Sequence, residues 1–169
     1  MNRLLLLRHA KAAWAAPGTR DFDRPLDEIG RRQAAEMGDM VLALGLVPRH
    51  VLCSPARRAR ETWDLLATRL TGDKPATDHD ERLYAADATT YLDIVREMSA
   101  DGPLLVVGHN PMLEDVAHIF AARGSKEARA GLAGGFPPCA MAVIAIDGDF
   151  AETTPATSEL AAFLTPGGR

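Results

Sequence analysis

Three apolar runs in this chain end directly in side chains that can bind an anion. Each run has the length of a short buried strand, and each is followed within a few residues by arginine or histidine. The pairs are Leu4–Leu7 with Arg8 and His9, Val51–Cys53 with Arg57 and Arg58, and Leu104–Val107 with His109. Guanidinium groups bind phosphate through two parallel hydrogen bonds, and neutral imidazole is a nucleophile. If the three runs are parallel neighbours, these groups meet at one edge of a sheet.

The middle segment, SPARRAR at residues 54–60, is typical of the start of a helix. Ser54 suits the N-cap and Pro55 the first helical position. Arginines there oppose the helix dipole by about 0.3–1 kcal/mol each, which indicates a nearby anion. A solvated basic face, supported by Glu61, explains this segment equally well when it is taken alone.

The third segment repeats this pattern. Gly108 permits a tight turn, Asn110 is suited to cap the next helix and Pro111 to begin it. His109 is then held at the sheet edge. A single histidine in such a place is more often structural than catalytic, so the inference depends on the three segments together.

Strand-like and helical patterns alternate along the chain, which predicts an α/β fold. We expect a three-layer α/β/α sandwich around a mostly parallel sheet. The predicted strands are 3–7, 50–53, 76–82 (at an edge), 104–107, 140–146 and 160–164, and the predicted helices are 29–44, 57–70, 89–98 and 112–122. Residues 1–164 are expected to form one domain and 165–169 a polar tail. Leu26, Ile29 and Met37 are expected in the core.

Composition narrows the class of protein. The chain has 169 residues, of which 47% are hydrophobic and 25% charged, with a net charge of -4. This favours a globular protein without nucleic-acid partners. Cys53 and Cys139 form no CxxC motif and are predicted to be buried thiols. The leucine run is too short for a membrane span or a signal peptide, so we expect a cytoplasmic protein without a membrane partner.

Other phosphate chemistries fit less well. A cysteine phosphatase needs arginine six residues beyond its cysteine, and both cysteines here have alanine at that position. No Gly-Lys-Ser/Thr loop of a nucleotide enzyme occurs. A metal-dependent HD phosphohydrolase is helical, whereas this chain alternates strands with helices. The residues from which such a metal site would be drawn are His50, His79, Asp80 and His118.

The segments LLLLRHAK, SPARRARET and VVGHNP together resemble the three signatures of the histidine phosphatase superfamily, and the short chain is similar to its SixA-type phosphohistidine phosphatases. The stretches DFDRPLDEIGRRQA and ERLYAAD are similar as well. The resemblance covers most of residues 3–146. Many members have glycine where this chain has Ala10, a change that SixA-type members tolerate. Phosphoglycerate mutases share the three signatures but have insertions for which this chain is too short.

The resemblance implies a phosphoglycerate mutase-like fold and a role for each matching residue. His9 is expected to be the nucleophile, while Arg8, Arg58 and His109 bind the phosphoryl oxygens. Arg58 fits the spacing of the signature and Arg57 does not. No metal and no cofactor are expected. Arg24 is the candidate contact to a phosphoprotein, and the other candidates for the pocket rim are Lys11 and Trp14.

The expected reaction proceeds through phosphohistidine at position 9. The preferred substrate is phosphohistidine on a protein, such as a histidine-phosphorylated signalling protein. The alternatives are a phosphatase of small phosphomonoesters and a non-catalytic phosphate-binding module. An ester needs a general acid, because its alkoxide is a poor leaving group, whereas imidazole leaves more readily. The candidate acids are Asp80, Glu81 and Asp87.

Overall fold

The computed structural model describes residues 2–99 and 101–167, and the strands in this part form one mixed six-stranded sheet. Its spatial order is β3-β2-β4-β1-β5-β6. Strand β5 is antiparallel to both neighbours, and the other strands all run in one direction. The strands are β1 (Asn2–Arg8), β2 (His50–Cys53), β3 (Ala76–His79), β4 (Leu104–Gly108), β5 (Met141–Ile146) and β6 (Ser158–Leu164). The mostly parallel α/β sheet is therefore as predicted.

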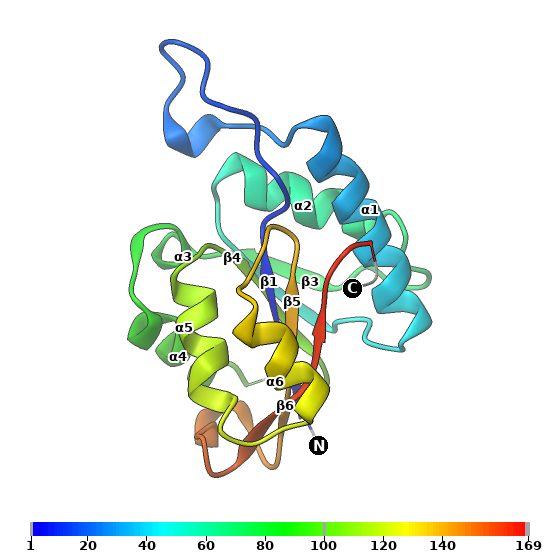
Figure 1. The fold of residues 1–169 in the computed structure, drawn as a ribbon, viewed down its shortest axis with the longest axis vertical. Coiled ribbons are helices and arrows are strands. Elements are labelled where there is room, and N and C mark those ends of the chain that lie inside the picture. The colour runs from blue at the N-terminus through cyan, green and yellow to red at the C-terminus, as the bar shows by residue number, and fades with distance from the viewer. Residues whose placement is uncertain (1, 100, 168–169) are drawn as a thin grey trace.

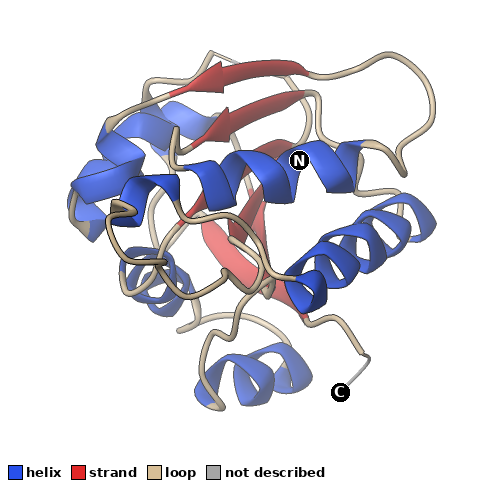
Figure 2. Ribbon diagram, turned by 90° about the horizontal axis from the view of Figure 1, so that it is seen from above, coloured by secondary structure: helices blue, strands red, loops and turns tan. Residues whose placement is uncertain are grey.

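Helices cover both faces of the sheet and complete the three layers (Figures 1 and 2). Helices α1 (Glu28–Ala43) and α2 (Arg57–Ala67) pack on one face. The other face is covered by α4 (Ala88–Arg96), α5 (Met112–Phe120) and α6 (Lys126–Ala133). The short elements are the helix α3 (Arg82–Ala85) and the 3-10 turns η1 (Asp21–Asp23) and η2 (Phe150–Glu152).

The leucine run of β1 is explained by burial on both faces. Leu4 and Leu6 point into the core under α4, α5 and α6, while Leu5 and Leu7 point into the core under α1 and α2. All four leucines are fully buried. A central strand of a doubly covered sheet has no solvent face, so its sequence shows no polar alternation.

The predicted core is correct except for Ile29. Leu26 and Met37 are buried, but Ile29 is 43% exposed. The buried stripe of α1 consists of Gly30, Ala34, Met37, Gly38 and Val41, and position 29 lies beside it on the solvent side. Gly30 is required in this stripe, because a Cβ there would lie 2.1 Å from the carbonyl oxygen of Lys11.

Most element boundaries differ from the predictions by one to three residues. The predicted strand 76–82 ends at His79, and the sequence did not predict α6, whose N-cap Ser125 accepts a hydrogen bond from the amide of Ala128. Both cysteines are buried free thiols, as predicted. Of the predicted tail, 168–169 lie outside the described residues, and the amide of Gly167 donates to Glu36. None of the helices among the described residues has both the length and the apolarity of a membrane span.

Candidate active site

The three predicted segments meet at the carboxyl end of the sheet. Strand β4 lies between β1 and β2, and Arg8 pairs with Gly108 in the register. Cys53 pairs with Val107 on the other side of β4. The residues that follow each strand, His9, Ser54 and His109, are therefore level with one another. The main chain of His9 is fixed on both sides, since its amide donates to Gly108 and its carbonyl accepts from Cys139.

The ring of His9 is held in one tautomer by the main chain. Its Nδ1 lies 2.7 Å from the carbonyl oxygen of Ala10. A carbonyl only accepts hydrogen bonds, so Nδ1 carries the proton and Nε2 keeps its lone pair. The Nε of Arg58 donates to this Nε2 at 3.3 Å. The ring nitrogen of His9 that keeps its lone pair thus faces a guanidinium group, a group that can bind a phosphoryl oxygen.

The surroundings of His9 keep its ring neutral. Burial, together with the positive charges of Arg58 and Arg8, lowers its pKa to about 4, although the hydrogen bond to Ala10 acts in the opposite direction. A neutral imidazole is the nucleophilic form. At pH 7 the ring is available for attack without prior loss of a proton.

Arg58 connects the two histidines and is held in a fixed position. It is only 7% exposed. Its Nη1 donates to the carbonyl oxygen of Asp21 at 2.8 Å, and its Nη2 lies 3.1 Å from the Asp21 carboxylate and 3.4 Å from Nδ1 of His109. Of the arginines in this segment, Arg57 instead forms a surface pair with Glu61. The choice of Arg58 over Arg57 therefore agrees with the direction in which each side chain points.

His109 is the second neutral imidazole of the site. It is 5% exposed, and its ring centroid lies 5.2 Å from that of His9. Arginine can only donate, so Nδ1 of His109 is the acceptor and Nε2 carries the proton that is donated to Oγ of Ser54 at 2.7 Å. Burial lowers its pKa to about 3, with further contributions from His9 and Arg58. An incoming phosphoryl anion would favour its protonated form.

Two roles predicted for capping residues are wrong. The N-cap of α2 is Ala56, without a side-chain cap; the hydroxyl of Ser54 accepts from the amide of Ala56 at 3.3 Å and also binds His109. Asn110 does not cap α5, whose N-cap is Pro111; its amide instead donates to Phe136 O and Glu114. Each of these side chains thus combines a local contact with a long-range one.

Arg8 completes the cationic side of the site. Its Nη1 donates to the carbonyl oxygen of Phe136 at 2.8 Å, the same oxygen that Asn110 binds. Its Nε is buried and makes no hydrogen bond within the described part of the chain. Burial lowers the pKa of Arg8, and Glu114 opposes this, but an arginine remains charged. The four predicted residues therefore gather in one place.

Comparison with known proteins identifies the family. The model of the histidine phosphatase superfamily (branch 1) matches residues 4–91, which include Arg8, His9 and Arg58. The chain belongs to the histidine phosphatase superfamily. It is also 34% identical to an uncharacterized protein of Mycobacterium tuberculosis over 95% of this chain and 99% of that protein.

Solved structures place this histidine phosphatase near the SixA type. The putative phosphohistidine phosphatase SixA from Agrobacterium tumefaciens is 32% identical, with a TM-score of 0.82 and 98% of each chain covered. The protein histidine phosphatase SixA complexed with tungstate shares the fold, with a TM-score of 0.72 at 20% identity and 97% of each chain covered. These similarities establish a phosphatase with the phosphoglycerate mutase-like fold.

Two residues that the sequence analysis did not assign hold the catalytic segments of this phosphatase in place. Thr62 Oγ1 accepts from the amide of Ala10 at 2.9 Å and donates to the carbonyl of Arg58 at 2.7 Å. Tyr91 OH accepts from the amide of His109 and donates to the carbonyl of Leu83. Tyr91 also explains Gly108, where a Cβ would lie 2.5 Å from the tyrosine oxygen. Thr62 was within the quoted SPARRARET segment, but nothing local indicated its partners.

The rim of the site is formed by the β1–α1 loop, residues 9–27. Arg24 does not point freely to solvent, since its Nε donates to Ala13 O and its Nη1 to Asp21. Lys11 pairs with Asp27, and Trp14 is 94% exposed. The structure thus places Arg24 next to Arg58 through a shared carboxylate, and leaves Trp14 on the outer surface.

The three candidate acids are engaged in other interactions or exposed. Asp80 accepts several hydrogen bonds from Arg82, which lower its pKa despite the opposing effect of burial. Asp87 caps α4 by accepting from the amide of Thr90. Glu81 is exposed. Asp80 and Asp87 are held as carboxylates, the form that cannot protonate a leaving group.

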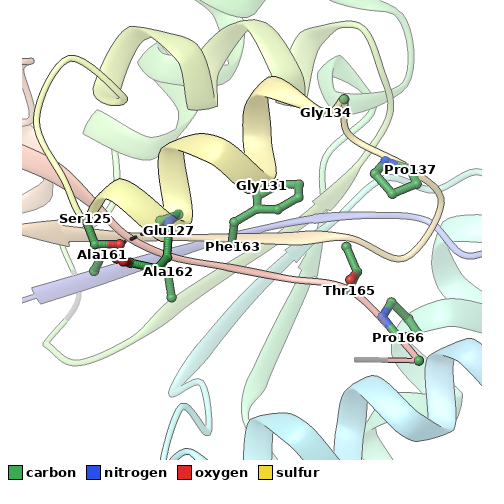
Figure 3. Close-up of a pocket in the computed structure, with 13 residues that line it drawn as sticks. Ser125, Glu127, Gly131, Gly134, Pro137, Ala161, Ala162, Phe163, Thr165 and Pro166 are labelled. Atoms are coloured by element: carbon green, nitrogen blue, oxygen red, sulfur yellow. Dashed lines mark hydrogen bonds between the residues drawn. The ribbon is translucent and has the colours of Figure 1, made fainter. Parts of the chain in front are cut away.

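A large cavity lies elsewhere, between α6, β6 and the C-terminal segment (Figure 3). It has a volume of about 1120 Å³ and is lined mainly by small residues such as Gly131, Gly134 and Ala162. Among the residues that the structure describes, Glu127 is the only charged one in its lining. Nor do the described residues include a group of three or more His, Cys, Asp or Glu side chains that is arranged to hold a metal ion.

Proposed function

We propose that this protein is a phosphohistidine phosphatase that removes phosphate from histidine on a protein, with His9 as the covalent nucleophile and without a metal ion. The observation that carries the proposal is the pairing of His9 Nε2, neutral and fixed in its tautomer, with the guanidinium of Arg58 at 3.3 Å. The same group that would bind a phosphoryl oxygen lies against the nitrogen that would attack phosphorus.

In the first step His9 Nε2 attacks phosphorus and the bond from phosphorus to the leaving nitrogen breaks. Arg8, Arg58 and a protonated His109 bind the equatorial oxygens, on which the negative charge is spread. The leaving imidazole takes the electron pair. In the second step water attacks phospho-His9, the ring is released and inorganic phosphate departs. Two lower barriers replace one high barrier.

The substrate is proposed to be phosphohistidine because the site offers no neutral carboxyl group among the predicted candidates. Asp80 and Asp87 are ionised and engaged with Arg82 and the amide of Thr90. An alkoxide leaving group needs a proton donor, and a protonated imidazole does not. The 32% identity to the SixA protein from Agrobacterium tumefaciens supports the same substrate class.

The test compares a histidine-phosphorylated protein with a panel of sugar and nucleotide phosphates, each with and without a chelator. We expect the highest kcat/KM for the phosphoprotein and no effect of the chelator. Higher kcat/KM for the small esters would overturn the phosphohistidine assignment. Loss of activity with the chelator would overturn the metal-independent mechanism.

A further inference from the structure

The rim of the active site carries an unusual pairing of a carboxylate with aromatic rings. The rings of Phe22, Tyr84 and His109 follow one another at centroid distances of 5.1 and 5.7 Å, both in edge-to-face arrangements. His9 continues this series, 5.2 Å from His109. An aromatic wall therefore leads from the nucleophile to the β1–α1 loop, which extends beyond the end of the sheet (Figure 1).

Asp21 lies at the outer end of this wall. Its Oδ2 accepts from Tyr84 OH at 3.0 Å and from Arg58 Nη2 at 3.1 Å, and its Oδ1 accepts from Arg24 at 3.0 Å. A carboxylate offers about four acceptor positions. These contacts use three, and the side chain remains 53% exposed. Asp21 can therefore accept one more hydrogen bond from the solvent side.

The carboxyl group of Asp21 is ionised at neutral pH. Burial alone would raise its pKa, but the hydrogen bonds from Arg24 and Tyr84 and the charge of Arg58 bring it to about 2. Asp21 is thus an anion at neutral pH, and in this form it cannot serve as a general acid. A negative group at the entrance of a phosphate site repels the substrate phosphate, so its presence calls for a compensating role.

We propose that Asp21 and Tyr84 form a subsite for the leaving group, which accepts the distal ring N–H of the substrate's phosphoimidazole. This inference rests on the proposed function and deepens it. Nucleophile and leaving group lie on opposite sides of phosphorus in an in-line displacement. His9 attacks from the sheet edge, so the leaving ring points outward, toward the β1–α1 loop and α3, which carry Asp21 and Tyr84.

The hydrogen bond to Asp21 assists departure of the ring. When the distal nitrogen is protonated, the electron pair of the breaking phosphorus–nitrogen bond neutralises the ring, which leaves as imidazole. Without that proton the ring would leave as an imidazolide anion, a far poorer leaving group. The Asp21 carboxylate keeps the proton on the distal nitrogen while the bond breaks, and the flat ring packs against Tyr84. A phenolate or alkoxide leaving group gains nothing from Asp21, because both are negative.

The test compares phosphoimidazole with p-nitrophenyl phosphate in the wild type and in Asp21→Asn. Asparagine keeps the shape of the side chain and removes its charge. We expect the ratio of kcat/KM for phosphoimidazole over that for p-nitrophenyl phosphate to fall about tenfold, the effect typical of one charge-assisted hydrogen bond. Tyr84→Phe should lower the same ratio by about threefold, since it removes one hydrogen bond to Asp21.

The matched control is Asp23→Asn, because Asp23 lies on the same turn but pairs only with the exposed Arg20 in the contacts described. Its ratio should equal that of the wild type. If Asp21→Asn lowers kcat/KM equally for both substrates, Asp21 only orients Arg58. The inference is then wrong, while the proposed function stands. If the wild type turns over p-nitrophenyl phosphate but not phosphoimidazole, the proposed function itself fails.

Discussion

Two regions of this molecule, the groove between α6 and β6 and the candidate active site, differ in their chemistry. The groove between α6 and β6 has a volume of about 1120 Å³ and is lined mostly by small or apolar residues (Figure 3). At the carboxyl end of β1, β2 and β4, the buried Arg58 contacts both His9 and the buried His109, and Arg8 lies beside them. Buried ionisable groups with shifted pKa values mark a reactive site better than empty volume does, since their burial costs stability that packing alone would not require.

The largest effect on activity is expected when the proposed nucleophile, His9, is removed from the active site. His9→Ala should lower kcat by at least about 1,000-fold, because in the proposed mechanism His9 forms the covalent intermediate. The measurement is steady-state hydrolysis of a histidine-phosphorylated protein, together with a search for an acid-labile phosphoenzyme. His118→Ala, on the exposed side of α5, is the control, and it should retain both the hydrolytic activity and the phosphoenzyme. A phosphoenzyme that persists in His9→Ala would contradict the assignment.

Two neighbouring arginines on α2 test whether the position of a positive charge matters for activity. Arg58→Ala should lower kcat/KM by about 100- to 1,000-fold, because it removes a buried charge aimed at the phosphoryl group. Arg57→Ala should stay within about twofold, since the exposed pair with Glu61 is a surface interaction. Equal losses in the two variants would mean that general positive charge, and not the position of Arg58, attracts the substrate.

The buried histidines should make folding stability depend on pH. Their pKa values are about 4 for His9 and about 3 for His109, against about 6.5 in an unfolded chain. At a pH between the folded and unfolded pKa values, each histidine is protonated in the unfolded chain but neutral in the folded protein. The free energy of unfolding is therefore highest above pH 6.5 and falls as the pH drops toward 4. Each histidine contributes up to about 1.4 kcal/mol per pH unit.

Denaturant unfolding of the wild type and of His109→Gln between pH 7.5 and 4.5 measures this dependence. The free energy of unfolding should depend less steeply on pH in the variant, because only one of the two buried-site histidines, His9, remains. Slopes that do not differ would show that His109 binds a proton as readily in the folded protein as in the unfolded chain, in conflict with its contact to Arg58.

The smallest effect is expected in the groove. Gly131→Ala places a Cβ about 3.0 Å from the ring of Phe163, which can shift slightly. We expect kcat/KM to stay within about twofold and stability to rise by less than about 1 kcal/mol, since alanine favours the helix. A large loss of activity would show that the groove and the active site are coupled. The ring of Phe163 packs against that of Phe136 at a centroid distance of 5.1 Å, and the carbonyl oxygen of Phe136 accepts from Arg8.

The mostly parallel sheet and the four central residues of the site could be predicted from the amino-acid sequence and its family signatures. Strands buried on both faces appear as continuous apolar runs, and the residues at their carboxyl ends share one edge, so Arg8, His9 and His109 could be placed together before their contacts were known. The choice of Arg58 over Arg57 came from the family signature, because both arginines begin the same helix and the local pattern does not distinguish them.

The contacts that hold these residues could not be predicted, because they join segments that are far apart in the chain. Ala10 O fixes the tautomer of His9, and Phe136 O holds Arg8 from 128 positions along the chain. Asp21 and Tyr84 meet across 63 positions. Ser54 illustrates the reason: its local pattern predicted a helix cap, but its hydroxyl binds His109, 55 positions away. A polar side chain takes whichever partner the packed fold presents, and short-range sequence patterns carry no record of that partner.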